Sequence, residues 1–333
     1  MKILLTGNLF HDYENDIKHG LEVLGHEVDM VFNNIHGPFH FRDVKTIPYW
    51  LKFGFLPDKF NINYFINDSI EQYNKAVQNK IKHHVYDALL VIGGKTISVE
   101  TLSKFPGRKI FWFLDALPRY IEIHHKLPYY NNIFVFEPSD VEYAKENYNL
   151  DVTFLSVGFS PKKYFKISNA TKKYDYSFVG SYYPKRDEYL TEIIRVSDKF
   201  CIYGDFFRSK NKALKRKNEK ISVHPMMVNE LYNATKVNIN IHHTQSKKGL
   251  SPRTFEILGS GGFEIVERQE MGLVYFEEDK HIVFYDSVDE FRDKCKYYLN
   301  KDREREKIAE AGYKIVLQNH TWKSRFEEMF ASL

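Results

Sequence analysis

Cysteine is scarce in this chain, because Cys201 and Cys295 are the only two among 333 residues. Two cysteines cannot build a disulfide framework, and they supply no paired thiolates for a metal site. No stretch reaches the ~20 apolar residues of a membrane-spanning helix, and the start, MKILLTG, lacks the long apolar region of a signal peptide. We therefore expect a cytoplasmic protein with no transmembrane segment and no bound metal.

A large excess of charge is also missing, since 48 Lys and Arg residues stand against 44 Asp and Glu, for a net charge of +4. Proteins that bind nucleic acid usually carry a larger positive charge, so nucleic acid is the less favoured partner. The basic run at 208–220 is interpreted as a solvated helix or loop rather than a phosphate-binding arm. What the chain does have is 43% apolar and 16% aromatic residues, enough for well-filled cores.

The order of apolar segments predicts two doubly wound α/β domains, because short β-branched runs alternate with helical spacers in both halves. The expected strands are 3–5, 26–32, 87–94, 109–115, 131–138 and 152–158 in the first half, and 174–181, 200–205, 237–242, 261–266 and 282–287 in the second. We predict an N-terminal domain over 1–165, a C-terminal domain over 166–318, and a helix over 319–333 whose apolar stripe packs back on the N-terminal domain.

The stretch from Pro38 to Phe65 interrupts this rhythm with aromatic and basic residues. Trp50, Phe53 and Phe55 lie there among Lys and Arg, a composition that could bind a lipid-linked or polymeric molecule and hold the protein peripherally at a membrane. The alternative is a loop that packs on the core.

The most informative segment is LSPRTFEILGSGGFEIV, residues 250–266. Ser251 is a good N-cap and Pro252 a good first helical residue, so a helix should begin there and present its N-terminal N–H groups to an anion. Arg253 in the first turn has the bidentate geometry for a diphosphate, and Glu256, one turn later, could accept two ribose hydroxyls. The alternative is an ordinary capped helix with a surface Arg–Glu pair.

The helix should stop at residues 259–262, GSGG, because glycine permits a positive φ angle. Gly261 and Gly262 would also let the backbone approach a ligand closely. We therefore include both among the candidate nucleotide-binding residues.

This segment resembles the nucleotide-sugar helix of GT-B glycosyltransferases, especially the spore-maturation CgeB-like group, in Arg253, Glu256 and the small-residue turn at 259–262. The resemblance extends in order over about residues 170–330. One departure concerns the mechanism. Many retaining members have two glutamates eight positions apart, and Lys248 stands eight positions before Glu256.

A second matching segment, YDYSFVGSYYPKRDEYL, resembles the first strand and loop of the family's donor domain. The resemblance places Gly180 and Ser181 near the phosphates and Arg186 after them. Together with Arg253, Glu256 and Ser251, these residues form the expected donor site.

The resemblance implies a GT-B fold, in which two Rossmann-like domains face a cleft, with the acceptor in the N-terminal domain and the nucleotide-sugar in the C-terminal one. It implies a glycosyltransferase of the hexosyltransferase class. The donor is a nucleoside-diphosphate sugar, with UDP-sugar favoured, and the acceptor is a hydroxyl of a glycan, glycolipid or other biopolymer. The nucleotide-sugar is a co-substrate, and no further cofactor is required.

Asp115 is the candidate catalytic base, because it ends the apolar run 109–115 and ligands of open α/β sheets bind at the carboxyl ends of strands. The segment also distantly resembles the phage DNA β-glucosyltransferases, in which an aspartate after a comparable strand deprotonates the acceptor. The alternative is an N-cap or turn aspartate before Pro118. Other candidate bases are His11, Asp12 and His124.

Two pairs of adjacent histidines are not metal motifs by themselves, because neighbouring side chains point in different directions. These pairs are His124–His125 and His242–His243. His242 ends an expected strand of the donor domain, so we predict that it contacts the sugar or a phosphate. Gly7, Asn8 and His11 follow the first strand, where GT-B enzymes present backbone to donor or acceptor, although Gly-Asn is also a common turn.

Two other functions compete with sugar transfer. One is a GT-B sugar-nucleotide epimerase, which would release nucleotide from a UDP-sugar without an acceptor. The other is a non-catalytic α/β binding protein, because a fold alone does not confer activity.

Overall fold

The computed structural model describes residues 1–8, 13–33, 62–220, 224–244 and 246–333. His11, Asp12 and most of the aromatic and basic stretch at 38–65 lie outside these residues. The chain divides into two compact units. One contains Met1–Phe136, Asp140–Phe154 and Leu333, and the other contains Glu137–Ser139 and Leu155–Ser332.

The first unit is built on a parallel sheet with the strand order β2-β1-β3-β4-β5-β6 among its described residues. The strands are β1 (Lys2–Asn8), β2 (Glu27–Asn33), β3 (Ala88–Ile92), β4 (Arg108–Phe113), β5 (Asn132–Val135) and β6 (Thr153–Phe154). The helices are α1 (Tyr13–Val23), α3 (Ile62–His83), α4 (Val99–Lys104), α5 (Ile121–His124) and α6 (Ser139–Tyr148), with short 3-10 turns at Leu117–Arg119 and Leu127–Tyr129.

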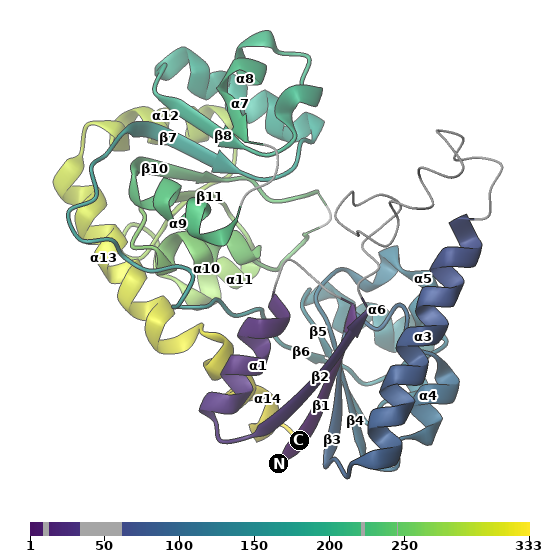
Figure 1. Cartoon of the computed structure of the whole chain (residues 1–333). Helices are drawn as coiled ribbons and strands as arrows, with labels where there is room; N and C mark the ends of the chain where they lie inside the picture. The colour runs from purple at the N-terminus through teal and green to yellow at the C-terminus, as the bar shows by residue number, and fades with distance from the viewer. Residues whose placement is uncertain (9–12, 34–61, 221–223, 245) are drawn as a thin grey trace. The chain divides into compact units, whose positions relative to one another are not determined.

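Helices on both faces explain the apolar character of these strands. Figure 1 shows α1 on one side of the sheet and α3 and α4 on the other. All five residues of β3 are consequently buried. Gly7 in β1 is required by this packing, because its φ is +137° and a Cβ there would lie 2.0 Å from the carbonyl oxygen of Ile92.

The second unit contains another parallel sheet, with the order β12-β11-β10-β7-β8-β9 among its described residues. The strands are β7 (Tyr174–Val179), β8 (Phe200–Tyr203), β9 (Asn218–Lys220), β10 (Thr235–Asn240), β11 (Glu264–Glu267) and β12 (Val283–Tyr285). The helices are α7 (Pro184–Val196), α8 (Lys212–Lys217), α9 (Pro225–Asn233), α10 (Pro252–Gly259), α11 (Glu270–Tyr275), α12 (Val288–Leu299), α13 (Asp302–Asn319) and α14 (Trp322–Ala331), with a 3-10 turn at Phe206–Arg208.

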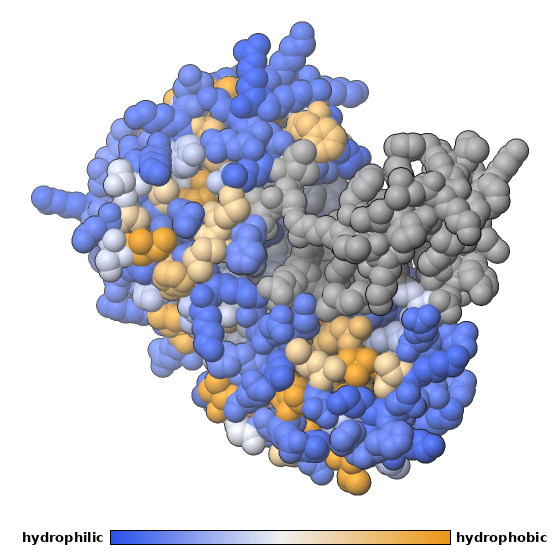
Figure 2. Space-filling model, viewed as in Figure 1, coloured by the Kyte–Doolittle hydropathy of each residue, from blue (hydrophilic) through white to orange (hydrophobic). Residues whose placement is uncertain are grey.

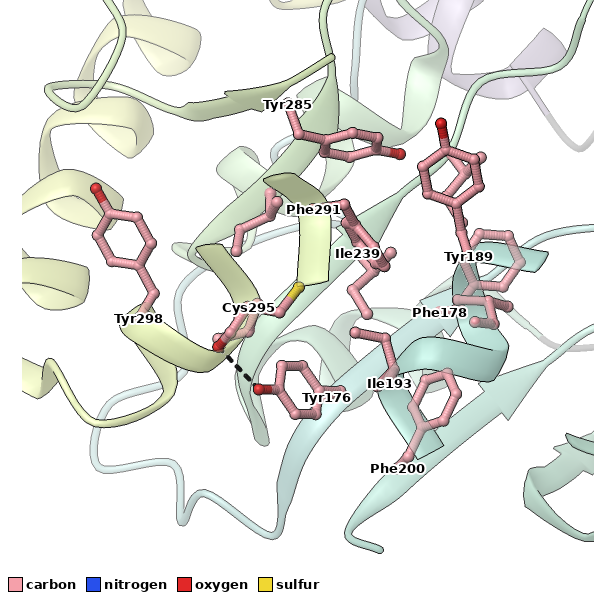
Figure 3. Packing of buried hydrophobic residues seen from close by; sticks show 14 of the residues in the cluster. Tyr176, Phe178, Tyr189, Ile193, Phe200, Ile239, Tyr285, Phe291, Cys295 and Tyr298 are labelled. Atoms are coloured by element: carbon pink, nitrogen blue, oxygen red, sulfur yellow. Dashed lines mark hydrogen bonds between the residues drawn. The ribbon is translucent and has the colours of Figure 1, made fainter. Parts of the chain in front are cut away.

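Aromatic side chains fill the core of this unit (Figure 3). Tyr176, Phe178 and Ile239 from the sheet pack with Phe291 and Cys295 from α12. The buried hydroxyl of Tyr176 donates a hydrogen bond of 2.8 Å to the carbonyl oxygen of Cys295, so the core leaves this polar group satisfied.

The prediction of two doubly wound parallel sheets is confirmed, and each expected strand overlaps one of β1 to β8 and β10 to β12, although the bounds differ by several residues in places. The prediction for the basic run at 208–220 is incomplete, because this run forms α8 and also the edge strand β9. The sequence of β9, Asn-Glu-Lys, has no apolar residue, and only its backbone pairing with β8 makes it a strand.

The segment 157–159 is hydrogen-bonded to the start of α14 within the second unit. The backbone N–H of Phe159 donates to His320 O at 3.1 Å, and the N–H of Trp322 donates to Phe159 O at 3.2 Å. The buried guanidinium of Arg325 donates from Nε to Val157 O at 3.0 Å. The predicted domain boundaries, and the predicted packing of the C-terminal helix on the N-terminal domain, stay predictions.

None of the described helices combines the length and the apolar character needed to cross a bilayer. On the face of the molecule shown in Figure 2, hydrophobic residues form small groups between hydrophilic ones.

Phe326→Ala should lower the free energy of unfolding by about 3–5 kcal/mol, because the Phe326 side chain is fully buried in the packing of α14. Urea unfolding followed by circular dichroism would measure the loss. Lys323→Ala on the same helix is the control, since this lysine is exposed and its loss should cost about 0.5 kcal/mol or less. Equal stability of the two variants would contradict the burial of α14.

Candidate functional site

Helix α10 begins at Pro252 with Ser251 in the N-cap position, as the sequence predicts. Ser251 has the expected extended backbone (φ −67°, ψ 153°), but among the described residues its side chain makes no cap hydrogen bond. The Ser251 hydroxyl instead accepts a hydrogen bond of 3.2 Å from Nδ2 of the Asn240 side chain. The helix ends at Gly259, and Gly261 has a φ of +68°, so the predicted glycine stop is confirmed.

Arg253 and Glu256 lie on one face of α10, as their spacing predicts. The Arg253 Nη1 atom is 2.5 Å from Glu256 Oε2. The carboxylate is buried, with 3% of its side chain exposed, whereas the Arg253 side chain is 34% exposed. The pair therefore holds the guanidinium at the first turn of the helix, where the positive end of the helix dipole also lies.

Arg186, in the first turn of α7, joins two loops of the second unit. Its Nε and Nη2 atoms donate to Ile241 O at 3.1 and 2.8 Å, and its Nη1 atom donates to Ser181 O at 2.8 Å. Gly180 makes room for this arrangement, because a Cβ there would meet Arg186 Nη1 at 3.1 Å. Burial, as the main cause, and the nearby positive charge of Arg253 together lower the pKa of Arg186 to about 10.

No described carboxylate forms an ion pair with Arg186, whose partly buried guanidinium lies over the rings of Phe178 and Tyr183. A buried cation is costly without a compensating negative charge. A bound anion near Arg186 and Arg253 would supply that compensation.

His242 follows β10 and is buried, with 1% of its surface exposed. Neither ring nitrogen has a hydrogen-bond partner among the described residues. Burial lowers the pKa of His242 to about 3, and the positive charges of Arg186 and Lys185 act in the same direction. The ring is therefore neutral at physiological pH and can offer one donor and one acceptor to a ligand.

The structure thus gathers most of the predicted donor residues at the carboxyl ends of β7 and β10. These residues are Gly180, Ser181, Arg186, His242, Ser251, Arg253 and Glu256. Gly261 and Gly262 are not brought to this place, because they follow the opposite end of α10, ~12 Å away along an eight-residue helix. A Cβ at Gly262 would meet the side-chain nitrogen of Asn238 at 2.7 Å, so the close packing before β11 explains this glycine.

Glu137 is a residue that sequence reasoning missed. Its carboxylate is buried and accepts hydrogen bonds from the backbone N–H groups of Lys248 at 2.9 Å and Gly249 at 3.2 Å. It thereby fixes the loop that leads into α10. The Lys248 side chain points to Glu270, with 3.2 Å between Nζ and Oε2.

Asp115 follows β4 in the first unit, and its carboxylate accepts three hydrogen bonds. Oδ1 accepts from Ala116 N at 2.8 Å and from Arg119 Nη1 at 2.9 Å, and Oδ2 accepts from the Tyr120 hydroxyl at 2.7 Å. The N-cap of the following 3-10 turn is Ala116, so the N-cap form of the alternative is wrong, whereas the local bonds to Ala116 and Arg119 are those of a turn aspartate before Pro118. The Asp115 side chain is 27% exposed and can be reached from solvent.

Other polar groups lie beside Asp115 at the carboxyl ends of β1 and β3. Lys95 Nζ lies 3.6 Å from the centroid of the Tyr120 ring. Burial lowers the pKa of Lys95, and the negative charge of Asp115 opposes this effect. Asn8 fixes the loop, because its Oδ1 accepts from Lys95 N at 2.9 Å and its Nδ2 donates to Thr96 Oγ1 at 3.1 Å. Lys95 could have been found from its place directly after a strand and two glycines.

His124 is less suited to act as a base than its sequence position suggests. The buried ring bonds through Nε2 to Leu117 O at 2.9 Å and through Nδ1 to the hydroxyl of Tyr148. Both nitrogens therefore serve the packing of α5 and α6.

The described residues contain no group of three or more His, Cys, Asp or Glu side chains placed to hold a metal ion. The expectation that the reaction needs no metal stays a prediction.

Comparison with known families gives one match, to a model described as glycosyl transferase-like, over residues 180–331. The matched part begins at Gly180 and includes Arg186, His242, Arg253 and Glu256. Comparison with curated proteins gives no match.

Several solved structures share the fold of the whole chain. A sucrose-phosphate synthase from Thermosynechococcus elongatus has 9% sequence identity and a TM-score of 0.65 over 100% of both chains. A glycosyltransferase from Rickettsia africae has 12% identity and a TM-score of 0.66 over 99% of this chain and 97% of its own. Anabaena HepE, in complex with UDP and glucose, has 10% identity and a TM-score of 0.64 over 100% of both chains. These likenesses confirm the GT-B fold.

The finer resemblances, to the CgeB-like group and to the phage DNA β-glucosyltransferases, are not confirmed by these matches. They stay predictions.

His242→Gln should gain stability relative to the native protein as the pH falls. The pKa of His242 is about 3 in the folded chain and near 6.5 in the unfolded one. Between these values only the unfolded chain binds the proton, so the native protein loses stability as the pH falls from 6.5 toward 3. The difference in Tm between variant and native protein should be more positive at about pH 5 than at about pH 7.5. The same difference at both pH values would contradict a buried neutral ring.

Proposed function

We infer that this chain, a glycosyltransferase of the GT-B fold, transfers a sugar from a UDP-sugar to a hydroxyl acceptor. One observation carries the nucleotide part of this proposal. Arg186 and Arg253 lie close enough for their charges to interact, at the carboxyl ends of β7 and β10, within the residues that match the glycosyl transferase-like family.

The second unit would bind the diphosphate through these two cations and the N-terminus of α10. The helix dipole and the guanidinium groups stabilise the negative charge that develops on the departing diphosphate. Glu256 would accept the ribose hydroxyls, while its ion pair with Arg253 holds both side chains in place. His242 is placed to contact a phosphate or the sugar.

The choice of UDP rests on a neighbour of the same fold, Anabaena HepE, which has been solved with UDP and glucose. The acceptor is proposed to be a hydroxyl of a glycan, glycolipid or other biopolymer, with nucleic acid the less favoured class. A cytoplasmic location, peripheral at the membrane for a lipid-linked acceptor, belongs to the same proposal, as does catalysis without a further cofactor.

The first unit would supply the base, Asp115. Its carboxylate is held by Ala116 N, Arg119 and Tyr120, and four lone-pair positions are available on its two oxygens. One position is left for the acceptor hydroxyl. Since Lys248 replaces one glutamate of the retaining pair, a base at Asp115 favours an inverting transfer. Asn8 and Gly7 shape the neighbouring loop.

Nucleotide release tests the function as a whole. For a transferase, UDP release from a UDP-sugar depends on added acceptor. A GT-B epimerase releases UDP without acceptor, and a non-catalytic binding protein releases none, so either result would replace the proposed function.

Arg253→Ala and Glu256→Ala should each raise the Kd for UDP on the order of tenfold or more, the first through lost phosphate contacts and the second through lost ribose contacts. Isothermal titration calorimetry measures both. Arg195→Ala is the matched control, because Arg195 forms an ion pair with Glu192 at the same i,i+3 spacing on α7. Unchanged UDP affinity in both α10 variants would remove the basis of the proposal.

Asp115→Asn should lower kcat by ~10²–10⁴-fold, because the amide keeps the size of the side chain and cannot accept the proton. The Kd for UDP should stay within about twofold, since Asp115 belongs to the other unit. Turnover and UDP binding are measured on the same preparation. Loss of UDP binding in this variant would make Asp115 a structural or sugar-contacting residue, and retention of the donor's anomeric configuration in the product would overturn the inverting assignment.

A further inference from the structure

A layer of buried polar side chains lies between β10 and the first turn of α10. Asn240 is its centre, with 4% of its surface exposed. Its Nδ2 atom lies 2.9 Å from Glu264 Oε1, 3.1 Å from Thr254 Oγ1 and 3.2 Å from Ser251 Oγ. Asn240 thus connects the N-cap and the first turn of α10 to the first residue of β11.

Glu264 is the unusual member of this layer. Its side chain is fully buried, no ion pair joins it to a described cation, and its Oε2 atom has no hydrogen-bond partner among the described residues. An ionised carboxylate in such surroundings would be strongly destabilised. Burial accordingly raises the pKa of Glu264 to about 8, although Asn240 and Thr254 favour the charged form.

We propose that Glu264, as a neutral carboxylic acid, is a positioning residue that acts through Asn240 to hold the first turn of α10 in the orientation that binds the nucleoside diphosphate. The proposal rests on the proposed function of this helix. The Glu264 carboxyl is protonated when the site binds the nucleoside diphosphate, and ionisation of Glu264 weakens this binding.

The sign of the effect follows from the charges around Glu264. Arg253 and Glu256 lie on α10. The charges of Arg253, Glu256 and Glu264 all affect the pKa of the buried Tyr232 of α9, so these four groups lie close together. His242, on the same chain segment as Asn240, is neutral. Burial keeps the hydroxyl of Tyr232 protonated well above pH 8. Glu264 is therefore the group in this set that changes charge as the pH rises through 8, and the change adds a negative charge beneath an anion site.

The test is the Kd of UDP at pH 7 and pH 9 for the native protein, Glu264→Gln and Asn240→Ala. Glu264→Gln keeps a neutral hydrogen-bonding side chain, so it should bind UDP at pH 7 within about twofold of the native protein. Between pH 7 and pH 9 the native protein should lose affinity on the order of fivefold more than Glu264→Gln. Ionisation of UDP itself affects both proteins alike and cancels in this ratio. Asn240→Ala should bind UDP on the order of tenfold more weakly at both pH values.

A carboxylate-to-amide control is Glu290→Gln on α12, where the glutamate is partly exposed and bonds to Lys294 and the backbone of Asp286. This variant should follow the pH profile of the native protein.

Thermal unfolding reports on Glu264 without ligand. Because its folded pKa lies above the ordinary 4.5, the native protein should lose stability relative to Glu264→Gln as the pH rises from 4.5 to 8.

An identical loss of UDP affinity in the native protein and Glu264→Gln would overturn the proposal. So would a folded Glu264→Gln that no longer binds UDP at pH 7, because the ionised form would then be the active one. Absence of UDP binding by the native protein is a different failure. It would overturn the proposed function of α10 and, with it, the positioning role of Glu264.

Discussion

The bonds of Arg186 to Ile241 O and Ser181 O are the interaction on which the candidate donor site depends. They tie the loop after β7 to the end of β10, and they hold a partly buried positive charge there. A Cβ at Gly180 would lie 3.0 Å from the Phe178 ring and 3.1 Å from Arg186 Nη1, so both side chains crowd this position. His242 is neutral partly because this charge is beside it. An anion is the natural complement of such a site.

The layer beneath this site follows a different rule. At the strand ends Arg186 and Arg253 are cationic and Glu256 pairs with Arg253, whereas one layer deeper Asn240, Thr254 and Glu264 are uncharged at neutral pH. Neutral polar groups can fix the start of α10 by hydrogen bonds without adding to the negative charge that Glu256 already places beside Arg253. The deeper layer therefore orients the helix, and the outer layer attracts the anion.

The first unit repeats the same geometry with other chemistry. Asn8 ends β1, and Lys95 and Asp115 follow β3 and β4, so three strand ends again place polar groups together. Here a carboxylate is the central group, and Tyr120 and Arg119 hold it. A carboxylate suits removal of a proton from a hydroxyl, whereas the arginines of the second unit suit a diphosphate.

The sequence by itself determined the parallel sheets and the start of α10, because apolar runs, Ser251-Pro252 and the glycine stop are local signals read within a few residues. It also placed Asp115 and His242 at strand ends. Only the tertiary structure decided that Arg186 bonds to a carbonyl 55 residues away and that β9 is a strand. In the run GGFEIV, Glu264 resembles a solvent-facing position of a strand. Its burial depends on α10 covering that face and on the side-chain bond from Asn240 of the neighbouring strand, and such non-local contacts leave no local pattern.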